Sequence, residues 1–299
     1  MSFIYSVIYH PKVNWLIRNV NHILSPVLPK KIRINPSGIV TIPVKGHKPL
    51  KFKTNQTNYL TAELFWNGVL KFEYTPIFMK LIKKVDTFFD IGGSIGYYSV
   101  LGSKINPKLK VQAFEPSLSS RQFFSENIKL NHLEEHITLN GMALSDKEGT
   151  IDFHVVKSSK YPSVPNLSGQ HNLDAVHNNL KSETITVDTD TLDNFVKKNN
   201  IQNIDLIKID TEGTENRILG NAAETIERFK PIIISEVLFD QIEAELEEII
   251  LKHQYEFYNH VNGKLQKASG LKRETDNGVR DCFFVHPSKK HLIEEFIAQ

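Results

Sequence analysis

Four predicted strands of this 299-residue chain each end in an acid, and these carboxylates are the side chains best suited to chemistry. They are Asp90 in "FFD", Glu115 in "AFE", Asp210 in "KID" and Glu236 in "IISE". One such acid means little, because acids often end a strand or cap the next helix. Ligands of an open α/β sheet bind outside the carboxyl ends of its strands, so four acids at that edge predict a shared functional cleft.

The segment "DIGGSIGYY" begins at the first of these acids and is rich in glycine. Gly92, Gly93 and Gly96 allow a sharp turn and a close approach of the backbone to a ligand. A dinucleotide site has the spacing G-x-G-x-x-G, but Ser94 stands where the second glycine would fall. Asp90 stands two residues before the first glycine, and a carboxylate there repels a pyrophosphate but attracts an amino group and a sulfonium. The segment therefore favours a cationic cofactor, S-adenosylmethionine, over a dinucleotide.

The other acids suggest roles in binding and catalysis. Glu115, 25 residues after Asp90, can accept hydrogen bonds from ribose hydroxyls. A cofactor of this kind donates a methyl group, and a nucleophile that must lose a proton to accept it benefits from a general base or a metal ion. We expect Asp210 or Glu236, on neighbouring strands, to be the base or an orienting group, with Glu212 beside them. A divalent ion held by these carboxylates is the alternative.

Other candidate groups have an ordinary structural interpretation. Glu212 and Glu215 could simply stabilise the N-terminus of the helix that follows them. The 12 histidines show no zinc-binding spacing, and His171, His177 and His260 are more typical of structural or solvated residues than of an acid or base. The single cysteine, Cys282, is predicted to lie buried in a strand.

The elements that must position the acids follow a regular order. From residue 85 onward, short apolar strands alternate with helices, which predicts an α/β fold with a mostly parallel sheet covered on both faces. Period-two alternation predicts two extra strands near 149–156 and 183–189, separated by a long polar loop at 157–182. Residues 1–80 are predicted to form an N-terminal appendage, and residues 81–299 the cofactor-binding domain.

The appendage has three predicted parts. Residues 3–24 form an amphipathic helix that breaks at Pro11, and residues 38–54 form a hairpin. A helical stretch that holds Tyr59, Trp66 and Glu73 either packs as an ordinary helix or covers the cofactor cleft as a lid. No apolar run is long enough to cross a membrane. The first helix is expected to pack on the body, and dimerisation or contact with a membrane surface are the alternatives.

Net charge and cysteine content indicate which partners and which cellular compartment to expect. The formal net charge is +2, which gives no electrostatic reason to expect nucleic acid or an acidic partner. One cysteine excludes an internal disulfide framework and suits a reducing compartment, so we expect a cytoplasmic protein.

Several motifs together resemble the FkbM family of S-adenosylmethionine-dependent methyltransferases. They are "FDIGGSIGYYS", "FEPS" with "SENIKLN", "ALSDKEGTI", "TLDNF" and "LIKIDTEGTENRILGNA", which span about 85–237 in the family's order. The sequence departs from the family at Ser94, where Asn is frequent, and at Thr214, where Ala is frequent. The resemblance implies a class I methyltransferase fold: a Rossmann-like sheet of seven strands, the last antiparallel.

The resemblance also assigns parts of the cofactor to residues. The glycine loop would hold the methionine part, Glu115 the ribose, and Met142 and Ala143 would lie near the adenine. The complete set predicted to bind the cofactor is Asp90, Gly92, Gly93, Ser94, Gly96, Tyr97, Glu115, Pro116, Met142, Ala143 and Asp210.

The predicted function is O-methylation of a hydroxyl on a sugar or another small natural-product-like acceptor. Two alternatives stay open at this point. One is a nicotinamide-dependent oxidoreductase, and the other is a non-catalytic member of the fold that binds a ligand or partner.

Overall fold

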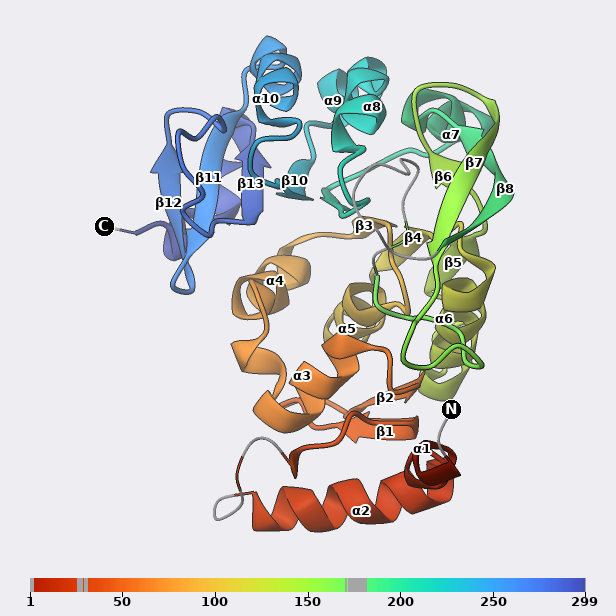
Figure 1. Cartoon of the computed structure of the whole chain (residues 1–299). Helices are drawn as coiled ribbons and strands as arrows, with labels where there is room; N and C mark the ends of the chain where they lie inside the picture. The colour runs from red at the N-terminus through yellow and green to blue at the C-terminus, as the bar shows by residue number, and fades with distance from the viewer. Residues whose placement is uncertain (1–2, 26–28, 30–31, 170, 172–181, 299) are drawn as a thin grey trace.

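The computed structural model describes residues 3–25, 29, 32–169, 171 and 182–298, and its elements follow the alternation expected from the sequence (Figure 1). The strands are β1 (Gly38–Ile42), β2 (Leu50–Thr54), β3 (Thr87–Ile91), β4 (Lys110–Phe114), β5 (Ile137–Asn140), β6 (Ala143–Leu144), β7 (Gly149–Val156), β8 (Ser182–Asp190), β9 (Leu206–Ile209), β10 (Ile232–Glu236), β11 (Glu256–Val261), β12 (Lys264–Ala268) and β13 (Asp281–Val285). The α-helices are α1 (Phe3–Ile8), α2 (Pro11–Leu24), α3 (Tyr59–Asn67), α4 (Thr75–Leu81), α5 (Tyr97–Ile105), α6 (Leu118–Asn131), α7 (Leu192–Lys198), α8 (Glu215–Gly220), α9 (Ala223–Phe229) and α10 (Glu243–Lys252).

The main sheet has eight strands in the order β12-β11-β13-β10-β9-β3-β4-β5. Strands β10, β9, β3, β4 and β5 are parallel, and β13 runs antiparallel to β10. Because β3, β4, β9 and β10 are parallel, their carboxyl ends lie at one edge of the sheet, and the strand order changes direction between β3 and β9. This arrangement confirms the Rossmann-like α/β fold.

The strand count is eight rather than the expected seven, because β12 adds a hairpin to β11. Asn262 and Gly263 join the two strands, and both have positive φ, 51° and 74°. A two-residue Asn-Gly turn of this kind matches the right-handed twist of antiparallel strands. The dipeptide was therefore a hairpin signal in the sequence, and the expectation of seven strands overlooked it.

A small separate sheet holds the two extra strands, in the order β6-β8-β7. Residues 137–144 are divided between the two sheets: β5 lies in the main sheet, and β6 pairs with β8 in the small one. Met142 lies between the two strands, and Ala143 begins β6. Residues 215–229 form two short helices, α8 and α9.

Two apolar clusters occupy the two faces of the main sheet. One contains Phe88 of β3 and Phe124 of α6, and the other contains Phe89 of β3 and Leu246 of α10. Adjacent residues of one strand point to opposite faces, so both faces of the sheet are covered, as expected. Cys282 is buried in β13, which confirms its predicted place in a strand.

The N-terminal elements confirm the predicted helix break and hairpin. Helix α2 begins at Pro11, and β1 pairs antiparallel with β2. Phe52 of β2 and Phe78 of α4 belong to the same apolar cluster as Phe88, so the hairpin and α4 share a core with the main sheet. The division at residue 80 stays a prediction. Within the described part of the chain, no helix is long and apolar enough to cross a membrane.

Candidate active site

One cavity of about 260 Å³ lies at the carboxyl edge of the main sheet. It is lined by residues that follow β3, β4, β5, β9 and β10, which the fold brings together from more than 140 residues of chain. Nine of the predicted site residues line it: Gly92, Ser94, Glu115, Pro116, Met142, Ala143, Asp210, Glu212 and Glu236.

Four other predicted cofactor contacts, Asp90, Gly93, Gly96 and Tyr97, lie behind this lining and shape the loop. The hydroxyl of Ser99 donates to buried Asp90 at 2.5 Å, and Tyr97 pairs with Thr75 through their hydroxyls. Gly96 has a φ of +88°, and a Cβ there would lie 2.1 Å from the ring of Phe124. The glycine is therefore required for packing against α6. Direct contact of these four residues with a cofactor stays a prediction.

Glu115 connects two loops at the end of β4. Its Oε2 accepts the N–H of Ser94 at 2.8 Å, and its Oε1 accepts the N–H of Ser117 at 2.9 Å. Burial raises the pKa of Glu115 to about 7, although both hydrogen bonds lower it. Each carboxylate oxygen keeps a lone pair, so the side chain can also accept hydrogen bonds from two adjacent hydroxyls.

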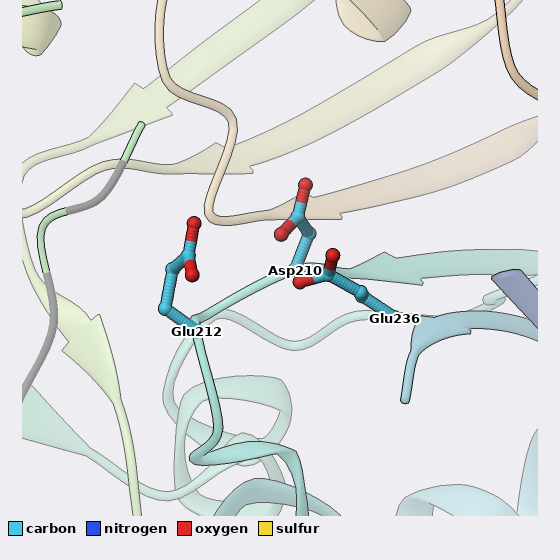
Figure 2. Close-up of side chains that lie close together, drawn as sticks. All are labelled: Asp210, Glu212 and Glu236. Carbon is cyan, nitrogen blue, oxygen red and sulfur yellow. The ribbon is translucent and has the colours of Figure 1, made fainter. Parts of the chain in front are cut away.

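Asp210, Glu212 and Glu236 form a carboxylate cluster at the ends of β9 and β10 (Figure 2). One oxygen of each lies within 4.8 Å of the others. Burial, with the charges of Asp210 and then Glu212, raises the pKa of Glu236 to about 9. Burial, with the charge of Asp210, raises the pKa of Glu212 to about 7. At neutral pH the cluster therefore holds at least one proton, or it can bind a divalent cation through three oxygen ligands.

The turn between β9 and α8 supports this cluster. Glu212 has a φ of 59°, an uncommon conformation for a residue with a side chain and one that concentrates at functional sites. The backbone N–H of Thr211 donates to Glu215 at 2.8 Å, and the Thr211 hydroxyl donates to the same oxygen. This contact supports the structural interpretation of Glu215.

Lys208 of β9 is a site residue that sequence reasoning missed. Its ammonium is buried, 3.2 Å from a carboxylate oxygen of Asp210 and 3.8 Å from one of Asp90. It also donates to the carbonyl of Gly92 at 3.1 Å. Burial opposes its charge, but Asp210 and Asp90 raise its pKa, so it stays an ammonium. The signal in the sequence was a lysine inside the apolar strand "LIKI".

Residues of the predicted lid differ in their contacts, and their role as a lid stays a prediction. Tyr59 and Glu73 line it, whereas Trp66 stacks on His22 and donates to the carbonyl of Ile34. The hydroxyl of Tyr98 donates to Glu73 at 2.9 Å. Burial, with the charges of Asp281 and Asp210, raises the pKa of Glu73 to about 8.

Of the three candidate histidines, the structure describes His171 and His260, and both contact other residues of the protein. His171 lines the cavity, but one ring nitrogen accepts the N–H of Val156 and the other pairs with the carbonyl of Asn166. His260 lies 3.6 Å from Asp281. His177 lies outside the described residues.

The donor set of the cavity fits a cationic ligand. Among the described residues that line it, five are acids and none is Lys or Arg: Glu73, Glu115, Asp210, Glu212 and Glu236. Four of these acids have a pKa raised to about 7–9, so a bound sulfonium or ammonium would favour their ionised form, whereas a pyrophosphate would be repelled by each acid that is ionised. S-adenosylmethionine carries both cations and a ribose diol for Glu115, so the residues present suit it.

Comparison with known proteins connects this site to a family. The model of the methyltransferase FkbM domain matches residues 90–263. The chain is 28% identical, over 156 residues, to the 2-O-methyltransferase NoeI of Sinorhizobium fredii, covering 50% of this chain and 62% of NoeI. It is 30% identical, over 84 residues, to a tRNA (guanine(37)-N(1))-methyltransferase of Dictyostelium discoideum, covering 28% of this chain and 18% of that protein. The chain thus spans less than two thirds of the length of either relative.

Solved structures also resemble the chain at low identity. A methyltransferase FkbM of Methylobacillus flagellatus superposes with a TM-score of 0.44 and 17% identity, over 77% of this chain and 47% of that one. An O-methyltransferase of Bacillus cereus in complex with SAH has a TM-score of 0.37 and 12% identity, over 70% of this chain and 79% of that one.

Proposed function

This chain belongs to the FkbM methyltransferase family, and from that premise we propose that it transfers a methyl group from S-adenosylmethionine to a hydroxyl of a sugar or a similar small acceptor. The observation that carries the proposal is one cavity that joins the predicted cofactor contacts to a cluster of three carboxylates. The name of the relative NoeI, a 2-O-methyltransferase, supports a hydroxyl as the methyl acceptor.

S-adenosylmethionine supplies an activated methyl group when it is bound, and the protein positions the reactants. In this proposal Glu115 accepts hydrogen bonds from the ribose hydroxyls. Gly92 and Ser94 lie beside the methionine part, and Met142 and Ala143 beside the adenine. The ionised carboxylates of the cavity attract the sulfonium and so strengthen binding of the cofactor.

The carboxylate cluster removes the proton from the acceptor hydroxyl. Glu236, whose pKa is raised to about 9, keeps its proton at neutral pH and orients the acceptor as a hydrogen-bond donor. Asp210 or Glu212 accepts the proton, and Lys208 offsets the charge next to Asp210. A divalent cation held by the three carboxylates would serve the same purpose by polarising the hydroxyl.

A second hollow offers a place for the rest of the acceptor. It measures about 480 Å³, and Ser168 lines both this hollow and the cofactor cavity. Its lining includes the rings of Tyr9 and Tyr161 and the amides of Asn35 and Gln56. Aromatic faces and amide groups are suited to the apolar faces and the hydroxyls of a sugar, so we propose that the acceptor extends into this hollow.

Calorimetry separates this proposal from the nicotinamide-dependent alternative. S-adenosylmethionine should bind, and NAD should give no heat of binding. Binding of NAD with no response to S-adenosylmethionine would overturn the proposal.

A turnover assay tests the acceptor class and the non-catalytic alternative. S-adenosylhomocysteine is measured with monosaccharides, oligosaccharides, non-sugar alcohols and transfer RNA, the last because of the name of the Dictyostelium relative. Product with a sugar acceptor supports the proposal, and product with transfer RNA alone contradicts it. Binding of the cofactor without turnover on any acceptor favours the non-catalytic alternative.

The single cysteine supports a reducing, cytoplasmic compartment, which we include in the proposal.

A further inference from the structure

Helix α2 has its apolar side chains on the outside. Trp15, Leu16, Val20, Ile23 and Leu24 are exposed, and Ile23 is 77% exposed. The residues that the helix buries are Asn14 and Arg18, on the opposite side of the helix. A helix on a protein surface normally buries its apolar face and exposes its polar face, so α2 is inverted relative to the usual arrangement.

Helix α1 and strand β1 extend this apolar surface. Phe3, Ile4 and Val7 of α1 are exposed, with Phe3 at 81%, and Ile39 of β1 is also exposed. An apolar hollow beside Trp15 is lined by residues of α2, β1, β2 and α6. In Figure 1, α1 and α2 lie beyond the β1–β2 hairpin, on the side away from the main sheet. Exposed apolar areas of this extent mark sites that contact another surface.

Specific hydrogen bonds hold α2 in this orientation. The Arg18 guanidinium donates to the carbonyls of Ser37 and Ile39 and to the side-chain oxygen of Asn14. The same oxygen of Asn14 accepts the N–H of Ser37, and the Asn14 amide donates to the carbonyl of Asn35. The polar side is therefore the anchored side, and the outward direction of the apolar side chains is part of the fold.

Basic side chains predominate in the segment that forms this surface. The first 62 residues contain nine Lys and Arg and no Asp or Glu, although the whole chain has a net charge of only +2. Lys12 lies on α2 itself, and Lys45, Lys48 and Lys51 are exposed on the hairpin. Glu126 of α6 adjoins the apolar hollow, and it is paired with Lys53 at 2.6 Å.

We propose that the surface formed by α1, α2 and β1 binds an anionic phospholipid bilayer, with the apolar side chains in the interface and the lysines near the headgroups. A helix of 14 residues is about 21 Å long, too short for a hydrocarbon core of about 30 Å, so α2 lies along the surface. A second copy of the chain is a poorer partner, because symmetric pairing would bring two acid-free, basic segments together. This inference does not depend on the proposed enzymatic activity.

Vesicle co-sedimentation of the full chain tests the inference. We expect binding to vesicles of phosphatidylcholine mixed with phosphatidylglycerol, and weaker binding to phosphatidylcholine alone or at high salt. The double variant Leu16→Ser/Ile23→Ser should lower the partition coefficient by at least about tenfold. The matched control, Leu70→Ser/Leu251→Ser, removes two apolar side chains that are 54% and 50% exposed elsewhere, and should bind like the wild type.

Three results would overturn the inference. The first is no binding to anionic vesicles. The second is equal loss of binding in the test and control variants. The third is a dimer, seen by analytical ultracentrifugation without vesicles, that Leu16→Ser/Ile23→Ser dissociates while vesicle binding is absent from the wild type; that result would identify a second copy as the partner. Circular dichroism of both variants verifies that each is folded.

Discussion

Two buried cations, Arg18 and Lys208, have different roles in two regions of this molecule. Among the described residues, Arg18 and Lys208 are the Lys and Arg side chains that are buried, at 2% and 6% exposure. Lys208 lies between the carboxylates of Asp90 and Asp210, next to the acidic cavity that Asp210 lines. Arg18 is held by carbonyls and an amide oxygen and anchors a helix. Lys208 thus balances the charge of carboxylates at the candidate active site, whereas Arg18 fixes the orientation of α2.

The two regions also differ in which side chains they bury and which they expose. At the carboxyl edge of the sheet, apolar side chains are buried and the acids face a cavity, as binding of a small cationic ligand requires. At α2, polar groups are buried and apolar side chains face outward, as binding of an extended apolar surface requires. The direction in which each element turns its polar side therefore indicates the kind of partner it can bind.

The largest effect is expected for the carboxylates of the cavity. Asp210→Asn should lower the turnover number by about 10²–10⁴-fold, because the cluster loses a charged proton acceptor. Steady-state production of S-adenosylhomocysteine measures it. Glu248→Gln, an exposed acid of α10, is the matched control and should keep the wild-type rate. An unchanged rate in Asp210→Asn would remove this residue from the proposed chemistry. Vesicle binding should be the same in both variants.

The two buried cations can be compared directly by urea unfolding. Lys208→Met should lower the free energy of unfolding by about 3 kcal/mol, because the buried carboxylate of Asp90 loses its charged partner. Arg18→Met should lower the free energy of unfolding by about 2 kcal/mol, because the carbonyl and amide oxygens that lose their hydrogen bonds to Arg18 are neutral. Leu16→Ser on the exposed side of α2 should stay within about 0.5 kcal/mol of the wild type. A larger cost for Leu16→Ser than for Arg18→Met would show that α2 is not inverted in solution.

The affinity for the cofactor tests the role of Glu115, the acid that follows β4. Glu115→Gln should weaken binding of S-adenosylmethionine by about 1–3 kcal/mol, because the side chain loses its charge and one acceptor oxygen. Isothermal titration calorimetry measures the change, and Glu134→Gln on the exposed surface serves as the control. Wild-type affinity in Glu115→Gln would contradict the ribose assignment.

The smallest expected effect is on how the stability of the protein depends on pH. Burial and neighbouring charges raise the pKa of Glu73, Glu115, Glu212 and Glu236 to about 7–9, from an ordinary value of 4.5. The folded protein therefore binds more protons than the unfolded chain in this range, so stability should fall as pH rises from about 5 to about 9. Glu236→Gln should reduce this fall by about 1–2 kcal/mol, since a neutral amide needs no proton.

Thermal unfolding at several pH values measures this slope. Arg18→Met is the control from the other region, and it should keep the wild-type slope because arginine stays charged throughout the range. A stability that is constant or rises between these pH values would contradict the raised pKa of the carboxyl groups.

Much of this protein could be predicted from local sequence patterns. The alternation of strands and helices, the break at Pro11, the hairpin at 38–54 and the four acids at strand ends each depend on a few neighbouring residues. Patterns of that length are determined by backbone preferences and side-chain periodicity. The FkbM motifs are equally local, which is why the family could be identified from the sequence and was confirmed.

Only the tertiary structure decided which groups share an environment. Glu73 reaches the cavity from a segment 137 residues before Asp210, and the raised pKa of Glu236 results from burial beside acids of another strand. Similarly, an amphipathic pattern predicts that α2 has an apolar side but cannot say which way that side faces. Its orientation depends on Arg18 meeting the carbonyls of Ser37 and Ile39. Burial, electrostatic coupling and orientation are sums over neighbours in space, so sequence alone could not determine them.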